Sequence, residues 1–239
     1  MAVHYYPYIN KILSQLRLKD TILSSFSAKP DQAFIKPFIT IAREPGSGGA
    51  PIAKAVAEKL GFVYVDEQIV EEIARSTKRR KAVIREIDEK QRGAIEDMVH
   101  SMLNKDYIDD IKYITEMVKV ILTYAHKGNC VILGRGGNFV TPFAKGLHVM
   151  VTAPYQVRVQ RAMDFEGHNK EAAERVIADV EKERNHFVKQ YLRKDPNKKN
   201  AYDLMINTTY FQVDEARDII CEAFYRKFSR SMRYGSILK

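Results

Sequence analysis

A glycine-rich turn over residues 46–49 is the part of the chain best suited to holding an anion. The turn, Gly46-Ser47-Gly48-Gly49, follows an apolar run over 38–42 and precedes a helical pattern with apolar residues at Ile52, Val56 and Leu60. In a strand–loop–helix unit of this kind, bare loop N–H groups and the positive end of the helix face the same anion. The sequence therefore predicts a phosphate-binding loop.

The loop lacks two chemical groups of the Walker pattern. That pattern, G-x-x-x-x-G-K-[ST], places a lysine on the β- and γ-phosphates and a hydroxyl on Mg²⁺. With Gly48 as its second glycine, Gly49 takes the place of the lysine, and Pro51 lies near the place of the hydroxyl. Arg43, just before the loop, could form an ion pair with Glu44 or could supply the positive charge of the missing lysine.

Three further charged residues are expected near the ends of parallel strands, where ligands bind in open α/β sheets. Asp66 follows a predicted strand directly, so it either caps the next helix or contacts a nucleotide or metal. Arg135 lies between glycines in a second turn, which suits bidentate phosphate recognition, with a structural salt bridge as the alternative. Asp203 comes at the start of its predicted strand and not at its end, so the argument that it lies at this edge is weaker than for Asp66 and Arg135.

Basic side chains are concentrated between residues 155 and 199, and they include Arg158, Arg161 and Arg184. The side chain of Arg184 could lie over apolar surface with its guanidinium in water. Alternatively, these arginines belong to a mobile lid that closes on a transferring phosphoryl group, whose charge must be stabilised away from water.

Strands and helices alternate along the chain. Strands are predicted over 38–42, 62–65, 129–133, 147–151 and 204–207, and helices over 67–75, 82–104, 107–127, 170–192 and 213–228. This alternation predicts an α/β fold with a parallel sheet covered on both faces.

Composition is that of a globular protein, with 45% hydrophobic and 29% charged residues, which permits a sizeable core. No run approaches the roughly 18 apolar residues of a membrane span, and the N-terminus lacks the layout of a signal peptide. Cys130 and Cys221 lie far apart, which favours two buried, reduced thiols over a disulfide or a metal site. We expect a cytoplasmic protein that does not associate with membranes.

The chain carries 39 Lys and Arg against 30 Asp and Glu, so its net charge is +9, which suits a phosphate-rich ligand such as a nucleotide or a nucleic acid. Basic residues gather over 75–92 and over 226–239. Alternatively, the first stretch is a solvated helix face and the second a frayed tail, without a role in binding.

Six segments, in this order, resemble the cytidylate kinase-like family of P-loop proteins over residues 37–225. The segments are ITIAREPGSGG, FVYVDEQIV, VILGRGGNFV, the R-x-x-R of Arg158 and Arg161, EKER at 181–184, and YDLMINTT at 202–209. The resemblance implies a P-loop NTPase-type, five-stranded parallel sheet flanked by helices. It also implies an N-terminal extension over 1–36, a kinase-like domain over 37–228 and a basic tail over 229–239. Within that domain it implies a helical monophosphate-binding insertion over 67–127 and a lid over 164–200.

The resemblance also implies roles for individual residues. Gly46, Ser47, Gly48 and Gly49 match the phosphate loop; Asp66, Arg135 and Asp203 match acceptor-side positions; and Arg158, Arg161 and Arg184 match lid arginines. Ala50, which we also expect to contact the nucleotide, departs from the family, whose members often have a basic residue directly after the glycines. We expect the three lid arginines to act in catalysis together with Arg43. The implied cofactors are ATP and Mg²⁺. True cytidylate kinases carry an Asp directly after the arginine of the second turn, whereas this chain has Gly136. The resemblance therefore implies the family's fold but not its specificity for cytidine.

Three functions follow from these observations. The first is transfer of the ATP γ-phosphoryl group to a nucleoside monophosphate, with Mg²⁺ bridging the phosphates. The second is a nucleotide-binding protein that has lost this transfer and acts as a sensor or partner module, which Gly49 and Pro51 favour and the retained lid arginines oppose. The third is nucleic-acid binding, for which the sequence has no RNA- or DNA-binding motif. The oligomeric state is not predicted by the sequence.

Overall fold

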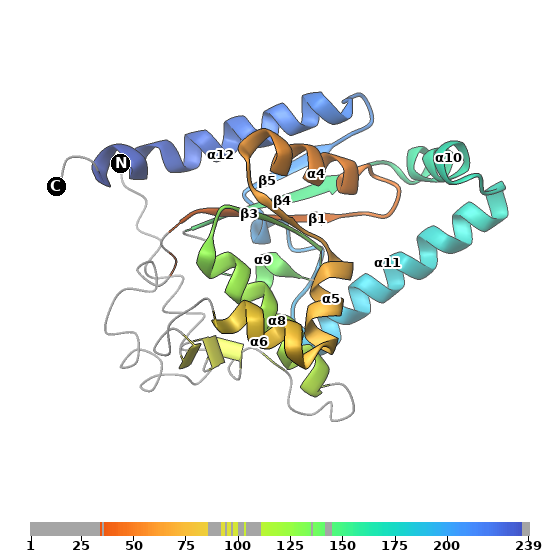
Figure 1. Cartoon of the computed structure of the whole chain (residues 1–239). Helices are drawn as coiled ribbons and strands as arrows, with labels where there is room; N and C mark the ends of the chain where they lie inside the picture. The colour runs from red at the N-terminus through yellow and green to blue at the C-terminus, as the bar shows by residue number, and fades with distance from the viewer. Residues whose placement is uncertain are drawn as a thin grey trace.

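A computed structural model shows a five-stranded parallel sheet with helices on both faces (Figure 1). The strands are β1 (Phe38–Arg43), β2 (Val63–Val65), β3 (Cys130–Leu133), β4 (Gly146–Thr152) and β5 (Leu204–Asn207). Their order across the sheet is β2-β3-β1-β4-β5, and each neighbouring pair is parallel. The predicted fold class is confirmed, and each of the five predicted strands is present.

The structure describes residues 34, 36–85, 92, 93, 95, 96, 98, 99, 103, 111–134, 136–141 and 145–235. Most of the predicted N-terminal extension, much of the predicted helix over 82–104 and the last four residues of the chain lie outside these ranges. Arg135 also lies outside them.

The helices connect the strands and cover the sheet. They are α4 (Gly49–Leu60), α5 (Glu67–Arg75), α6 (Thr77–Arg85), α8 (Ile111–Lys127), α9 (Gly137–Val140), α10 (Tyr155–Glu166), α11 (Lys170–Leu192), the short 3-10 helix η1 (Lys199–Ala201) and α12 (Val213–Gly235). The predicted bounds of α5 and α11 are confirmed. The closing helix, predicted over 213–228, begins as predicted and continues to Gly235.

Alternating side chains of the sheet build a core on each face. On one face the sheet packs against α4 and α12 through a cluster that includes Ile39, Ile41, Ile52, Val56, Ile220 and Phe224. On the other face it packs against α8 and neighbouring helices through a cluster that includes Phe38, Val65, Ile121, Ile132 and Leu192. Strands buried on both faces read as continuous apolar runs, which is why they could be predicted from the sequence.

Helices α10 and α11 form a unit of their own beyond the carboxyl ends of β1 and β4. They pack on each other through a small separate cluster of Val159, Ala162, Ala173 and Ile177. In Figure 1 they extend away from the sheet, next to the loop that joins β1 to α4. The side chain of Asn169 caps α11 by accepting a hydrogen bond from the N–H of Ala172 at 2.8 Å. None of the described helices is both long enough and apolar enough to cross a membrane.

Candidate nucleotide-phosphate site

The glycine-rich loop turns tightly between β1 and the N-terminus of α4. Gly46 and Gly48 adopt φ angles of 75° and 80°, which disfavour any residue with a Cβ. A Cβ on Gly46 would also lie 2.7 Å from the carbonyl oxygen of Arg158, so the α10 backbone lies directly against the loop. The buried hydroxyl of Ser47 donates to the carbonyl of Glu44 at 2.8 Å, which closes the turn.

The backbone N–H groups at the start of α4 are available to an anion. Within the described ranges, no hydrogen-bond acceptor of the protein meets the N–H groups of Gly48, Gly49 or Ala50. Pro51, in the first turn of α4, has no N–H and so removes one further donor without disturbing the helix. Unpaired donors at the positive end of a helix suit an anion such as a phosphate, and phosphate binding by this loop stays a prediction.

The side chain of Arg43 occupies the space that a residue larger than glycine would need at position 49. A Cβ on Gly49 would lie 2.5 Å from the Cβ of Arg43 and 2.9 Å from its Cγ. The first carbons of the Arg43 side chain therefore occupy the space in which a lysine side chain at position 49 would begin. The guanidinium itself lies further along, at Gly134 and Glu67, and its role in place of the lysine charge stays a prediction.

The ion-pair partner of Arg43 is Glu67, at the start of α5, and not the neighbouring Glu44. The Nη2 atom of Arg43 lies 2.9 Å from Oε1 of Glu67, and only 8% of the Arg43 side chain is exposed. To reach Glu67, Arg43 passes the end of β3 at Gly134, where its Nη1 atom takes the place that a Cβ would occupy. Arg43 therefore forms a strand-end ion pair, as one alternative held, but with Glu67 in place of Glu44, and its side chain connects β1 with the ends of β3 and β2.

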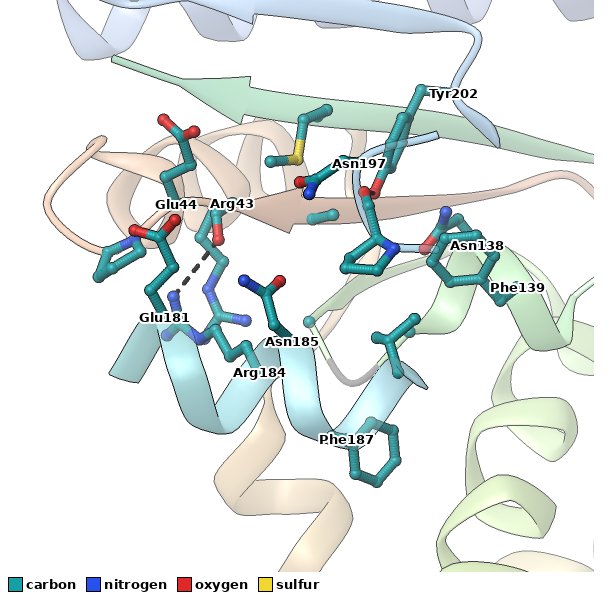
Figure 2. Close-up of a pocket in the computed structure, with 17 residues that line it drawn as sticks. Arg43, Glu44, Asn138, Phe139, Glu181, Arg184, Asn185, Phe187, Asn197 and Tyr202 are labelled. Atoms are coloured by element: carbon teal, nitrogen blue, oxygen red, sulfur yellow. Dashed lines mark hydrogen bonds between the residues drawn. The ribbon is translucent and has the colours of Figure 1, made fainter. Parts of the chain in front are cut away.

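Arg184 reaches the same point from α11. Its Nη1 atom donates to the carbonyl of Arg43 at 3.3 Å, drawn as the dashed line in Figure 2, and its Nη2 atom lies 3.7 Å from Oε1 of Glu67. The Arg184 guanidinium thus lies at the end of β1, with 27% of the side chain exposed. Glu67 was not identified from the sequence, where its only signal is its place directly after Asp66.

Arg158 lies behind the loop, where two carboxylates neutralise its charge. Its Nη1 atom donates to Oε2 of Glu181 at 2.9 Å, and its Nε atom lies 3.7 Å from Oε2 of Glu44. Glu44 is itself held in place, since the same oxygen accepts a hydrogen bond from the N–H of Ala153 at 3.0 Å. In this arrangement Arg158 supports the loop, and its side chain is 8% exposed.

Arg161, one turn further along α10, contacts the loop itself. Its guanidinium donates to the carbonyl of Ser47 at 3.2 Å and to Thr208, the residue directly after β5. Each of the four arginines predicted to act in catalysis therefore contacts the loop or the residues that flank it.

The two predicted acceptor-side aspartates have different positions. Asp66 caps α5, with its Oδ1 atom accepting from the N–H of Ile69 at 2.9 Å, which is the capping alternative given above. Asp203 lies at the amino end of β5, where its Oδ2 atom accepts from the N–H of His148 at 2.8 Å and from Nζ of Lys227 at 2.6 Å. Burial lowers the pKa of Lys227, while the bond to Asp203 opposes this shift. The structure does not bring Asp203 to the loop.

A cavity of about 90 Å³ opens between the carboxyl ends of β1 and β4 and the helix α11 (Figure 2). Its lining includes Arg43, Glu44, Glu181 and Arg184 at the charged side, Met150, Phe139, Phe187 and Val188 as apolar wall, and Asn138, Asn185, Asn197 and Tyr202 as polar groups. The cavity therefore places arginines beside a pocket that has carboxamides and one phenol. Arg43 and Arg184 were predicted as site residues, whereas the sequence analysis assigned no role to the polar side chains of Asn138, Asn185, Asn197 and Tyr202.

Gly136 shows why this chain has no aspartate in the second glycine-rich turn. Gly136 has a φ angle of 67°, and a Cβ there would lie 2.6 Å from Cδ1 of Leu192 on α11. A side chain at this position would therefore collide with the last turn of α11.

The basic stretch over 75–92 is partly neutralised by acidic neighbours. Within its described part, Arg79 pairs with Glu72, and Arg80 lies 3.2 Å from Glu116 of α8. These ion pairs are those of a solvated helix face, and they give no particular support to nucleic-acid binding.

Both cysteines are free and buried, as predicted from their spacing. Burial raises the pKa of Cys130 to about 12, and it also raises the pKa of Cys221. Among the described residues, no group of three or more His, Cys, Asp and Glu side chains could hold a metal ion.

The model of the cytidylate kinase-like family matches residues 38–210. The cytidylate kinase of Sulfolobus acidocaldarius is 26% identical over 193 residues, which cover 79% of this chain and 94% of the relative. That of Staphylothermus marinus is 30% identical over 195 residues, covering 80% of this chain and 97% of the relative. Among solved structures, an uncharacterized protein from Eubacterium ventriosum superposes with a TM-score of 0.62 at 21% identity, covering 79% of this chain and 97% of that one, and so shares its fold. The chain belongs to the cytidylate kinase-like family.

Proposed function

We propose that the protein is a nucleoside-monophosphate kinase, which transfers the γ-phosphoryl group of ATP to a nucleoside monophosphate with Mg²⁺. Membership of the cytidylate kinase-like family supports a kinase-type phosphotransferase. The observation that carries the proposal is the position of Arg43, whose side chain fills the space of the missing Walker side chain at Gly49.

In this proposal the loop binds the donor phosphates. The free N–H groups of Gly48, Gly49 and Ala50 face the anion, and Arg43 supplies the charge that the lysine supplies in other P-loop proteins. Phosphoryl transfer needs little covalent chemistry from the protein, because catalysis consists mainly of positioning and electrostatic stabilisation. An arginine can therefore serve in place of a lysine if its guanidinium reaches the phosphates.

The helices α10 and α11 lie in and next to the segment proposed as the lid, residues 164–200. Their arginines form ion pairs with Glu67 and Glu181 and hydrogen bonds with backbone carbonyls. A bound phosphate must therefore displace the present partner of at least one of these arginines. Arg184 is the best placed to act on the phosphoryl group, since it lines the cavity beside Arg43. Arg158 and Arg161 are proposed to act mainly through the loop that they contact.

The residues present fit a magnesium ion held chiefly by the nucleotide. Mg²⁺ commonly keeps several waters and binds through substrate phosphates with one or two carboxylates, so a dedicated cluster of protein ligands is not needed. Bound Mg²⁺ would neutralise developing charge on the phosphates and orient them. The carboxylates of Glu44, two residues before the loop, and of Glu67, the ion-pair partner of Arg43, are proposed to contact the ion.

The acceptor is proposed to occupy the cavity beside Arg184, within reach of the segment 67–127 that the family resemblance assigns to the monophosphate. Arg135 is proposed to bind the acceptor phosphate, because its turn follows β3 at the carboxyl edge of the sheet. Gly136 has no side chain, so this position provides no aspartate to recognise the base. We therefore propose a pyrimidine monophosphate as acceptor without a requirement for cytosine.

Two features of the site favour a second function. Arg158 is enclosed by Glu44 and Glu181, and the position of the Walker lysine is a glycine, as expected if the loop binds a nucleotide but no longer transfers its phosphoryl group. Such a protein would act as a sensor or a partner module.

One experiment separates the two functions. The purified protein is incubated with ATP, Mg²⁺ and each nucleoside monophosphate in turn, and release of ADP is followed by a coupled assay, while ATP binding is measured by calorimetry. Acceptor-dependent release of ADP supports the kinase. Binding of ATP without turnover of any monophosphate supports the inactive nucleotide-binding protein.

A further inference from the structure

We propose that Thr208 and Arg161 are positioning residues that fix the orientation of the peptide between Ser47 and Gly48. This orientation directs the N–H of Gly48 into the phosphate site. The inference rests on the proposed binding of phosphate by the loop, but it concerns two residues outside that loop.

The carbonyl of Ser47 receives two hydrogen bonds from elsewhere in the fold. The hydroxyl of Thr208 donates to it at 2.7 Å, and Nη1 of Arg161 donates to it at 3.2 Å. The hydroxyl also lies 3.2 Å from the carbonyl of Thr152, but the contact with Ser47 is shorter. One carbonyl of the loop is therefore held from both α10 and the end of β5.

Thr208 and Arg161 also hold each other. Nη1 of Arg161 donates to Oγ1 of Thr208 at 2.9 Å, and its Nη2 atom donates to the carbonyl of Thr208 at 2.7 Å. These bonds orient the hydroxyl as an acceptor from Arg161 and as a donor to Ser47. The three groups form a closed network, in which each side chain fixes the other.

The hydrogen bond between Thr208 and the Ser47 carbonyl is buried, so water does not compete for it. Thr208 is 1% exposed and Ser47 is fully buried. A buried carbonyl that loses its hydrogen-bond donor still bears the full free-energy cost of desolvation. A hydrogen bond to this carbonyl therefore stabilises the fold more than one at the surface. The buried position of Thr208, directly after β5, makes its hydroxyl a fixed part of the fold.

The carbonyl and the N–H of one trans peptide point in opposite directions. A Ser47 carbonyl held towards Thr208 therefore directs the N–H of Gly48 away from α10 and β5. Gly48 and Gly46 both have positive φ, as in backbone nests whose N–H groups surround an anion. Rotation of this peptide would present a carbonyl oxygen to the phosphate instead, and the two would repel each other.

The next residue provides a matched control. Thr209 is a second threonine at the same strand end, but its hydroxyl bonds to the side chain of Asn207 at 2.6 Å in an exposed position. Replacing either threonine by valine removes one hydroxyl and keeps the shape of the side chain. Only Thr208→Val removes a hydrogen bond to the loop.

The test measures binding of inorganic pyrophosphate, and of ATP, by isothermal titration calorimetry. We expect Thr208→Val to bind pyrophosphate about tenfold more weakly than wild type, which corresponds to about one buried hydrogen bond. Thr209→Val should bind within about twofold of wild type, and Thr208→Ser, which keeps the hydroxyl, should bind like wild type. If Thr208→Val binds as tightly as Thr209→Val, or if Thr208→Ser loses as much affinity as Thr208→Val, the inference is wrong.

A measurement on wild type does not depend on how the variants fold. In ¹H–¹⁵N spectra, titration with pyrophosphate should shift the Gly48 amide strongly, because its N–H gains an anionic acceptor. Saturating binding without a shift at Gly48 would overturn the inference while leaving the phosphate site intact. No binding of pyrophosphate or ATP by wild type would instead refute the phosphate site of the proposed function, and the inference with it.

Discussion

Arg43 and Gly49 share one space: a Cβ on Gly49 would lie 2.5 Å from the Cβ of Arg43. The missing Walker lysine and the arginine at the end of β1 are therefore one structural feature and not two separate departures. A larger residue at position 49 requires Arg43 to move, and Arg43 is held by its ion pair with Glu67 at 2.9 Å.

Restoring the Walker lysine should harm the protein. We expect Gly49→Lys to lower the free energy of unfolding by about 1–3 kcal/mol, because the new side chain overpacks a site that Arg43 already fills. Ala50→Lys is the matched control, since Ala50 is exposed on the same turn of α4, and it should leave stability nearly unchanged. Denaturant unfolding of both variants measures the difference, and a Gly49→Lys variant that is as stable as wild type would contradict the overlap.

Two arginines of α11 should differ in their effect on catalysis. Arg184→Ala should lower kcat by about 30- to 1,000-fold, or about 2–4 kcal/mol, because its guanidinium lies beside Arg43 where charge develops. Arg175→Ala, on an exposed face of the same helix, should leave kcat within about twofold of wild type. ATP affinity is measured in parallel, and a loss in affinity as large as the loss in kcat would show that Arg184 binds the ground state.

Arg158 should contribute to the free energy of unfolding. Arg158→Ala leaves the carboxylates of Glu44 and Glu181 without their shared partner, so we expect a loss of about 1–3 kcal/mol in the free energy of unfolding. Arg184→Ala, in contrast, should lose less than about 1 kcal/mol, since Arg184 is more exposed. Equal losses in the two variants would argue against a supporting role for Arg158.

Arg135 is expected to serve the acceptor phosphate. Arg135→Ala should raise the acceptor KM and lower kcat/KM by about 2–4 kcal/mol of transition-state stabilisation, with the donor KM as internal control. Steady-state kinetics with each substrate varied in turn measure both constants. Unchanged kinetics in a folded variant would show that Arg135 is structural.

The two thiols should be unreactive in the folded protein. Burial raises the pKa of Cys130 to about 12 and raises the pKa of Cys221, so at pH 8 both groups stay protonated, and the thiolate is the reactive form. Ellman's reagent should label both residues in guanidinium chloride and neither in buffer. Rapid labelling of the native protein would contradict the buried positions.

The sheet and the loop could be predicted from the sequence because their signals are local. Strands buried on both faces give continuous apolar runs, and the turn at 46–49 needs glycines where φ is positive. The partner of Arg43 could not be predicted in this way. Glu44 is its neighbour in the chain, but strand order places Glu67 within reach across the end of β3, at a glycine that leaves room for the side chain.

The acceptor side was the least predictable from the sequence. Asp203 was expected near the site by its place in a motif, but it precedes β5 and pairs with Lys227 of α12. The polar lining of the cavity comes from carboxamides such as Asn138, Asn185 and Asn197, which lie far apart in the chain. Tertiary packing of α9 and α11 against the sheet brings them together, and no local pattern encodes that arrangement.

The most direct measurement is single-turnover transfer of labelled γ-phosphoryl from ATP to a pyrimidine monophosphate, by wild type and by Arg43→Lys and Arg43→Ala. We expect wild type to form labelled diphosphate only with Mg²⁺, Arg43→Lys to keep part of this rate, and a folded Arg43→Ala to be at least about 30-fold slower. Wild type that binds ATP but forms no labelled diphosphate, or Arg43→Ala that transfers as fast as wild type, would contradict an arginine acting in place of the Walker lysine.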